Sequence, residues 1–291
     1  MENVVDGYVT YLQLEKNISE NTIEAYRLDL KKLVTFLENI SIFSFDKVSF
    51  THLNSYILQM EKKGRASSTV SRSISTIKSF FGWLYDRRLI KADPSRNLKP
   101  PKVEKKVPEI LTLQEVDEFL SLPDMESKKG IRDKAMLELL YATGMKVSEI
   151  VMLKLSDVDL FTATATIQDK DRERMVRFGN PAKRALDIYI NTVRPGIASG
   201  DSKELFVNMN GKAMSRQGFW KVIKQYGDST NFAQKITPHV FRNSFAAHMI
   251  ENGADLKTLQ EILGHAEIAT TQVYSAFIPK SKDIYHMHPR K

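Results

Sequence analysis

The chain has 291 residues, of which 42% are hydrophobic and 27% charged, an ordinary globular composition with enough material for two domains. It contains no cysteine, which excludes disulfide bonds and thiolate zinc sites and fits a reducing cytoplasm. The formal net charge is +8, and no stretch approaches the roughly 20 consecutive apolar residues of a membrane span. Because the acidic N-terminus does not match a signal peptide, we expect a cytoplasmic protein with no membrane partner.

The N-terminal third has the periodicity of amphipathic helices. One apolar stripe runs through SENTIEAYRLDLKKLVTFLE and a second through SSTVSRSISTIKSFFGWLYDRRLI. The stripe residues are Ile23, Tyr26, Leu30, Leu33 and Leu37 in the first segment, and Val70, Ile74, Ile77, Phe81 and Leu84 in the second. With the intervening THLNSYILQMEKKG, residues 1–96 are predicted to form a small helical domain.

A proline-containing segment then interrupts the helical pattern. NLKPPKVEKKVPEI holds three prolines and a cluster of lysines, which favours a semi-extended linker over residues 97–111. A second domain, residues 112–291, is predicted to start at Thr112, because Thr112 and Glu115 have the spacing of a capping box ahead of an apolar run. Helical patterns dominate from there.

One segment of the second domain has the period of β-strands. TATATIQDKDRERMVRF alternates threonine with Ala163, Ala165 and Ile167, passes a charged turn, and resumes with apolar residues. This pattern predicts a β-hairpin with Lys170 near its tip or on its edge.

Basic residues gather at one helix start, after that helix and along the linker. Small Ser and Thr residues lie among the first group, and such mixtures commonly contact the DNA backbone. Together with the positive net charge, they favour a nucleic acid as partner, although a solvated charged face on a merely basic enzyme is the alternative. The three groups are Lys62, Lys63, Arg65 and Arg72, then Arg87, Arg88, Lys91 and Arg96, then Lys99, Lys102, Lys105 and Lys106.

Four side chains near the C-terminus suit phosphate chemistry. His239 and Arg242 open the apolar segment PHVFRNSFAAHM, and His265 and Tyr274 follow in order. Each has an ordinary explanation alone, since histidine and tyrosine are often structural and arginine often forms surface ion pairs. The ordered set is harder to explain as packing.

These segments resemble the tyrosine recombinases, also called integrases, and within them the bacterial Xer group. LLYATGMKVSEI resembles the first arginine box, PHVFRNSFAAHMIENGADLKTLQEILGHAEIATTQVY the second, and SENTIEAYRLDL the helical core-binding domain. The resemblance covers nearly the whole chain. It implies a mostly α-helical fold with a small β-hairpin or sheet, in which a SAM-like core-binding domain and a catalytic domain form a C-shaped clamp around duplex DNA.

The resemblance implies cleavage of one DNA strand by a tyrosine hydroxyl, with a 3′-phosphotyrosyl link and a free 5′-hydroxyl as products, followed by rejoining to a second DNA end. It assigns Tyr274 as the nucleophile and Arg242 as the donor to the scissile phosphate. A tyrosine with a pKa near 10 needs activation. Preorganised cations stabilise the charge of phosphoryl transfer, so neither a metal nor another cofactor is expected.

The same resemblance assigns the remaining site residues. His239 and His265 would bind phosphate and transfer protons, and Lys170 is the general acid for the leaving oxygen. Glu149, the acidic residue of the first box, would orient its neighbours. Lys146 stands where the family has the first arginine.

The sequence departs from the family at three places. Lys146 keeps the charge of arginine but lacks its bidentate fork. Asp169 and Asp171 replace glycines beside Lys170, where they would raise its pKa and repel phosphate. Asn243 replaces a common histidine and receives no chemical role. These changes predict an attenuated or highly regulated enzyme, with a catalytically inactive DNA-binding paralogue as the alternative.

A function outside nucleic acids is a metal-dependent hydrolase that uses His239, His248 and His265. No carboxylate completes a recognisable ligand motif around them, and their spacing fits no common zinc pattern. The sequence therefore gives this reading little support.

By resemblance, two pairs of protomers would assemble on two DNA sites as a homo- or hetero-tetramer, each passing its C-terminal tail to a neighbour. The tail FIPKSKDIYHMHPRK offers Phe277, Ile278, Ile284 and Tyr285 as anchors, and a tail docked on its own chain is the alternative. The sequence leaves open which DNA site is the target and whether a paired recombinase or an accessory activator is required. It also leaves open the choice between chromosome-dimer resolution in cell division and mobile-element integration. Chain length favours the simple Xer type.

Overall fold

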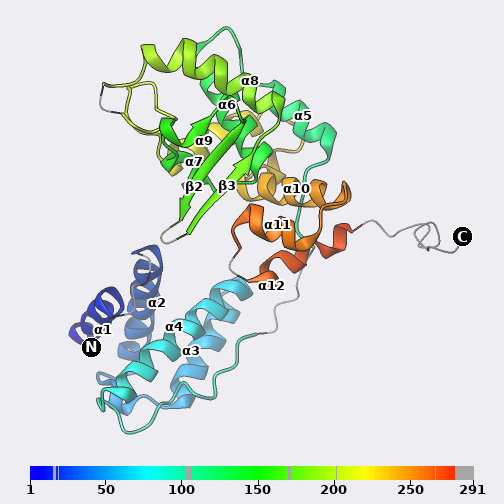
Figure 1. Ribbon diagram of the computed structural model, residues 1–291. Helices are drawn as coiled ribbons and strands as arrows, with labels where there is room; N and C mark the ends of the chain where they lie inside the picture. The colour runs from blue at the N-terminus through cyan, green and yellow to red at the C-terminus, as the bar shows by residue number, and fades with distance from the viewer. Residues whose placement is uncertain are drawn as a thin grey trace, which may run out of the picture. The chain divides into compact units, whose positions relative to one another are not determined.

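The chain divides into two compact units, Met1–Lys105 and Lys106–Lys291. Figure 1 shows the computed structural model, which is mainly helical with one small sheet. It describes residues 1–15, 18, 20–101, 107–169, 172–200, 202–265 and 267–278. No helix among these residues is both long and apolar enough to cross a membrane.

The first unit is helical, as its apolar periodicity predicted. Both predicted stripes are buried except for Tyr26, which is partly buried, and the rings of Tyr8, Phe45, Phe80 and Phe81 pack edge to face in the core of the unit. Its elements are α1 (Glu2–Leu14), α2 (Glu20–Asn39), η1 (Phe45–Lys47), α3 (Phe50–Lys62) and α4 (Ser67–Asp86).

Two of the basic residues assigned to the DNA backbone already have carboxylate partners. The Arg72 guanidinium donates two hydrogen bonds, of 3.0 and 3.1 Å, to the buried carboxylate of Asp29 on α2. Arg87 pairs with Glu15 across 2.9 Å at an exposed position. Arg72 therefore has a structural reason to be basic, because it neutralises a carboxylate that burial would otherwise destabilise.

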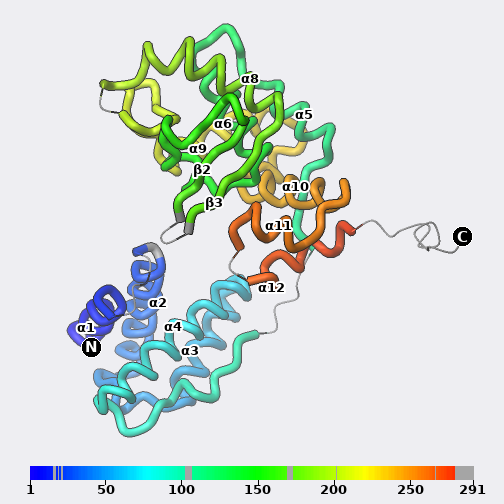
Figure 2. Tube along the Cα trace, viewed as in Figure 1, coloured from blue at the N-terminus to red at the C-terminus, as the bar shows by residue number. Residues whose placement is uncertain are grey.

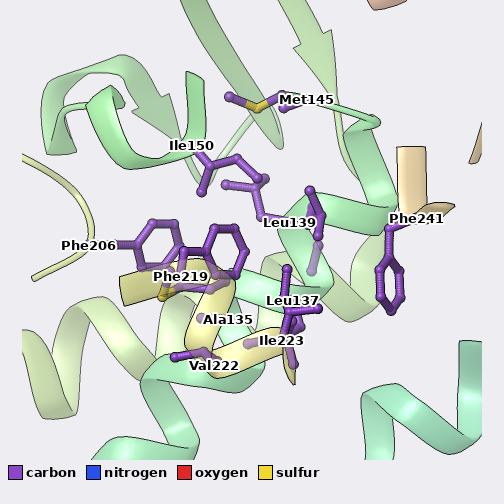
Figure 3. Packing of buried hydrophobic residues seen from close by; sticks show 14 of the residues in the cluster. Ala135, Leu137, Leu139, Met145, Ile150, Phe206, Phe219, Val222, Ile223 and Phe241 are labelled. Atoms are coloured by element: carbon purple, nitrogen blue, oxygen red, sulfur yellow. The ribbon is translucent and has the colours of Figure 1, made fainter. Parts of the chain in front are cut away.

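The second unit packs around α6. Figure 3 shows Leu137 and Leu139 of this helix in one buried cluster with Phe219 and Ile223 of α9 and with Phe206. The helical elements of this unit are α5 (Leu113–Ser121), α6 (Lys128–Thr143), α7 (Val147–Met152), η2 (Leu155–Asp157), α8 (Asn180–Ile188), η3 (Tyr189–Val193), η4 (Arg194–Gly196), α9 (Arg216–Gly227), η5 (Ala233–Lys235), α10 (Pro238–Glu251), α11 (Leu256–Leu263), α12 (Ile268–Thr271) and η6 (Gln272–Phe277).

The predicted capping box is present at the start of α5. The Thr112 hydroxyl accepts a hydrogen bond from the Glu115 amide, and the Glu115 carboxylate accepts one from the Thr112 amide. This reciprocal pair satisfies two backbone donors that a helix start leaves open.

The predicted hairpin is also present. β2 (Thr164–Asp169) and β3 (Arg172–Arg177) pair antiparallel, with Thr164 opposite Arg177 and Asp169 opposite Arg172. Ala165 and Ile167 face the core, but Ala163, which the pattern placed in the strand, lies in the preceding turn with a φ of 53°. A two-residue strand, β1 (Val158–Asp159), pairs with β2 and completes the sheet. Lys170 and Asp171 lie outside the described residues.

The C-terminal helices come together at one end of the second unit. Figure 2 traces the chain through α10, α11 and α12, with α10 in contact with α11 and η6 and the end of α11 beside β3. This arrangement brings together side chains of α10, the turn after α11, and η6.

Candidate active site

Helix α10 presents Arg242 inside the second unit. Thr237 caps the helix, since its hydroxyl accepts a hydrogen bond from the Val240 amide at 3.2 Å, and Pro238 occupies the first turn, where no amide donor is needed. The side chain of His239 is exposed in this first turn, whereas Arg242 is only 6% exposed. The same helix therefore places His239 at the surface and Arg242 in the interior.

The Arg242 guanidinium is bound by the C-terminal ends of two other helices. Its Nη1 donates to the carbonyl of Gly144, the residue that ends α6, and its Nη2 donates to the Leu263 carbonyl at the end of α11, at 2.8 Å. Both helices end in a glycine with a left-handed backbone, Gly144 at φ 60° and Gly264 at φ 67°. Carbonyls at helix C-termini carry partial negative charge, so they favour the buried cation.

His265 bonds directly to this arginine. Arg242 Nη2 lies 3.0 Å from His265 Nε2, and His265 Nδ1 lies 2.8 Å from the buried Thr271 hydroxyl. Because arginine has only donors, Nε2 must accept and the ring must be neutral, with its proton on Nδ1. Burial, aided by the charges of Arg242, Lys146 and Arg174, lowers the pKa of His265 to about 4.

Tyr274 lies on η6 and is 4% exposed. Its hydroxyl donates a 2.8 Å hydrogen bond to the side-chain carbonyl of Asn243, the residue after Arg242. Burial raises the pKa of Tyr274, and the charge of Arg242 offsets part of this effect. The hydroxyl is therefore held in its protonated form.

Lys146, Glu149 and Arg174 form a charged group beside His265. The Lys146 amide donates to Glu149 Oε2 at 2.7 Å, and the Lys146 Nζ lies 3.7 Å from Oε1. Arg174, on β3, donates to Glu149 Oε2 at 2.9 Å and to the Ile262 carbonyl at 3.0 Å. Glu149 thus lies between two cations, which agrees with an orienting role.

The structure brings together Arg242, His265 and Tyr274, with Lys146 close enough to influence the His265 ring. It places His239 at the exposed helix start, while Lys170 stays a prediction outside the described residues. His248 belongs to a different environment, because its Nδ1 lies 2.9 Å from the Tyr141 hydroxyl. Within the described ranges, no group of three histidine, aspartate or glutamate side chains is arranged to hold a metal ion.

Sequence reasoning missed the role of Asn243 and the carbonyl partners of Arg242. Asn243 adjoins the arginine in sequence, but its partner Tyr274 lies 31 residues further on, and no local pattern connects them. Backbone carbonyls carry no sequence signature at all. The left-handed glycines, Gly144 and Gly264, were the available signal, since such residues mark helix ends.

The chain is similar to known recombinases and integrases along its whole length. Residues 5–88 match the model "Phage integrase, N-terminal SAM-like domain", and residues 109–279 match "Phage integrase family". Tyrosine recombinase XerD of Staphylococcus epidermidis is 42% identical, with all of both chains covered. The crystal structure of XerA recombinase is 25% identical with a TM-score of 0.54, covering 100% of this chain and 99% of the other. The Tn1549 transposon integrase, solved with circular intermediate DNA, is 22% identical with a TM-score of 0.72, covering 93% and 94%.

We expect the His265 ring to stay neutral in the folded protein until the pH falls to about 4. The unfolded chain, with a histidine pKa of about 6.5, takes up this proton first, so the His265 contribution to the free energy of unfolding is constant above about pH 6.5 and declines between there and about pH 4. Nuclear magnetic resonance of the histidine rings measures the midpoint directly.

The variant His265→Gln assigns the signal and serves as the control for the stability profile. His248, whose pKa burial also lowers, is present in both proteins and cancels in the comparison. A His265 midpoint near 6.5 would contradict the neutral, arginine-bound ring.

Proposed function

The chain belongs to the phage integrase family, and we propose that it is a Xer-type, site-specific tyrosine recombinase that cleaves and rejoins DNA through a 3′-phosphotyrosyl intermediate. The observation that carries this proposal is the convergence of a buried arginine, its bonded histidine and a buried tyrosine on one end of the second unit. In the proposed mechanism these side chains, and not a metal ion, stabilise the charge of phosphoryl transfer. The curated relative is itself called a recombinase, which favours the active enzyme over a non-catalytic paralogue.

We assign Arg242 to the scissile phosphate. Three of its five N–H groups bond to Gly144, Leu263 and His265 among the described residues. We assign the two others to the non-bridging oxygens, whose negative charge grows in the transition state. Since the contacts to both carbonyls fix the guanidinium beforehand, little reorganisation is needed when DNA binds.

The chemistry then follows from the assigned residues. The Tyr274 oxygen attacks the phosphorus, the bond from phosphorus to the 5′-oxygen breaks, and the leaving oxygen takes a proton from Lys170. His265, once its Nε2 is released from Arg242, accepts the tyrosine proton, and the exposed His239 and Lys146 contact the phosphate. Rejoining reverses these steps with a second 5′-hydroxyl.

The partner is double-stranded DNA, on which the protein assembles as an oligomer. The net charge of +8 and the similarity to an integrase solved with DNA support this assignment. A cytoplasmic location is part of the proposal, because bacterial chromosomal DNA lies there. The proposed function is also compatible with a second, paired recombinase and with an accessory activator.

We assign the tetramer contact to the C-terminal tail, passed from each protomer to its neighbour. A pocket of about 430 Å³ is lined by Tyr141, Phe245, His248 and Met249 among others. Its lining combines apolar and polar side chains, which suits an apolar anchor residue surrounded by polar contacts. Tail residues Ile284 and Tyr285, which lie outside the described range, are the anchors for such a pocket.

Covalent trapping tests the proposed function. A nicked suicide duplex with a Xer-like site should give a denaturation-resistant protein–DNA adduct, because the released fragment cannot return to attack the phosphotyrosine. Tyr274→Phe should give none. As a matched control, Tyr226→Phe removes a hydroxyl bonded to Asp133, away from the site, and should keep the adduct. Specific DNA binding without an adduct would favour the inactive paralogue.

We predict that Lys146→Arg accelerates single-turnover cleavage. The guanidinium fork would supply a hydrogen bond that lysine lacks, and at about 1.5 to 3 kcal/mol for a charged group this corresponds to roughly a ten- to hundredfold rate increase. The Lys146 side chain is 46% exposed, so an arginine can be accommodated.

Rapid-quench measurement of adduct formation at saturating DNA gives this rate. Lys146→Ala is the control for loss of charge and should cleave more slowly than the natural protein. The double variant Asp169→Gly, Asp171→Gly tests the hairpin separately. If all of these reversions leave the cleavage rate unchanged, the prediction that Lys146, Asp169 and Asp171 slow the enzyme is wrong.

For the tail, we expect deletion of residues 279–291 to abolish the tetramer on two DNA sites while leaving binding to a single half-site unchanged. Mass photometry of DNA complexes distinguishes the two. Ile284→Asp should reproduce the assembly defect, and Lys280→Ala, in the same segment, should not. A full tetramer from the truncated chain would refute tail exchange.

A further inference from the structure

Asn243 connects the tyrosine to the segment that begins the second unit. The residue is 6% exposed, and its Oδ1 accepts the Tyr274 hydrogen bond at 2.8 Å while its Nδ2 donates to the Glu109 carbonyl at 3.3 Å. Because a carbonyl can only accept, the Glu109 contact fixes which end of the carboxamide faces the tyrosine. The contact between Nδ2 and Glu109 therefore holds Oδ1, the acceptor for the Tyr274 hydroxyl, in place.

The neighbouring residue makes a second link to the same segment. The Leu111 amide donates a 2.8 Å hydrogen bond to the buried Ser244 hydroxyl, which itself donates to the Val240 carbonyl. Consecutive residues of α10 thus hold residues 109–111, but only Asn243 also holds Tyr274. Ser244 consequently offers a matched comparison for loss of the segment contact alone.

In this arrangement the tyrosine is not ready to react. Its hydroxyl proton is donated to a neutral carboxamide, which does not take up a proton at ordinary pH. With 4% of the residue exposed, a DNA phosphate has no in-line approach to the oxygen unless η6 moves. The hydrogen bond to Asn243 belongs to a resting position of Tyr274.

We propose that Asn243 is a positioning residue that keeps Tyr274 in this resting position, so that strand cleavage requires the Asn243–Tyr274 hydrogen bond to break. The inference rests on the proposed function of Tyr274 as the nucleophile. It gives a role to one of the sequence departures, because the carboxamide both accepts from the hydroxyl and donates to Glu109. Removal of the acceptor then favours the reactive position of the tyrosine.

The test compares single-turnover cleavage of the nicked suicide duplex by the natural protein, Asn243→Leu, Asn243→Ala and Ser244→Ala. Leucine has the branching and the number of side-chain heavy atoms of asparagine without its hydrogen bonds, and alanine keeps the test valid should the leucine variant fail to fold. Rates are measured across DNA concentrations, so that the maximal rate and the half-saturating concentration are obtained separately. Circular dichroism of each variant establishes that it is folded.

We expect the folded Asn243 variants to raise the maximal cleavage rate by about fivefold, the value of one ordinary hydrogen bond, with an unchanged half-saturating DNA concentration. Ser244→Ala should cleave at the natural rate. An unchanged or lower rate in the Asn243 variants overturns the inference, as does an equal acceleration by Ser244→Ala, which would assign the effect to the 109–111 segment. An adduct that persists in Tyr274→Phe would instead refute the proposed function.

Discussion

The candidate site depends on one buried cation, the Arg242 guanidinium, held by carbonyls at the ends of two helices. A buried charge is costly unless its hydrogen bonds are satisfied, and each hydrogen bond to a charged group is worth about 1.5 to 3 kcal/mol. The carbonyls that bind Arg242 lie where α6 and α11 end. Gly144 shows how closely the parts fit, because a Cβ there would lie 2.3 Å from the Phe245 ring, in addition to the strain of its φ of 60°.

Burial and the same cation together set the protonation states around it. Burial lowers the pKa of His265 and the charge of Arg242 lowers it further, so the histidine is neutral and can accept a hydrogen bond from the guanidinium. It also favours the phenolate of Tyr274, yet burial outweighs this effect and the pKa of the tyrosine is raised. Glu149, bound by Arg174 and Lys146, supplies the negative charge that keeps these cations together. A phosphate entering the site would add a second anion and would stabilise the arrangement further.

The features predicted from sequence are those with a local signature. Apolar stripes located α2 and α4, the Thr112 and Glu115 spacing located the start of α5, and alternation located β2 and β3. Contacts between residues far apart in sequence had no such signature, including the Arg72–Asp29 ion pair, 43 residues apart, and the Asn243–Tyr274 bond. β1 was missed because two residues cannot show a period. The domain limits, the Lys170 role and the exchanged tail stay predictions.

With the proposed roles of Arg242 and Tyr274, the site combines a phosphate-binding group that is already fixed with a nucleophile that is not yet in position. Arg242 is fixed by helix ends that cannot shift without disturbing the core, so its geometry changes little when DNA binds. Tyr274 is on a six-residue 3₁₀ helix at the end of the described chain, where it packs with α10, α11 and α12. Since the Asn243–Tyr274 hydrogen bond must break before the tyrosine reacts, we infer that η6 is the element that moves before cleavage. An enzyme that breaks DNA gains from this division, because phosphate binding alone then does not expose the strand to attack.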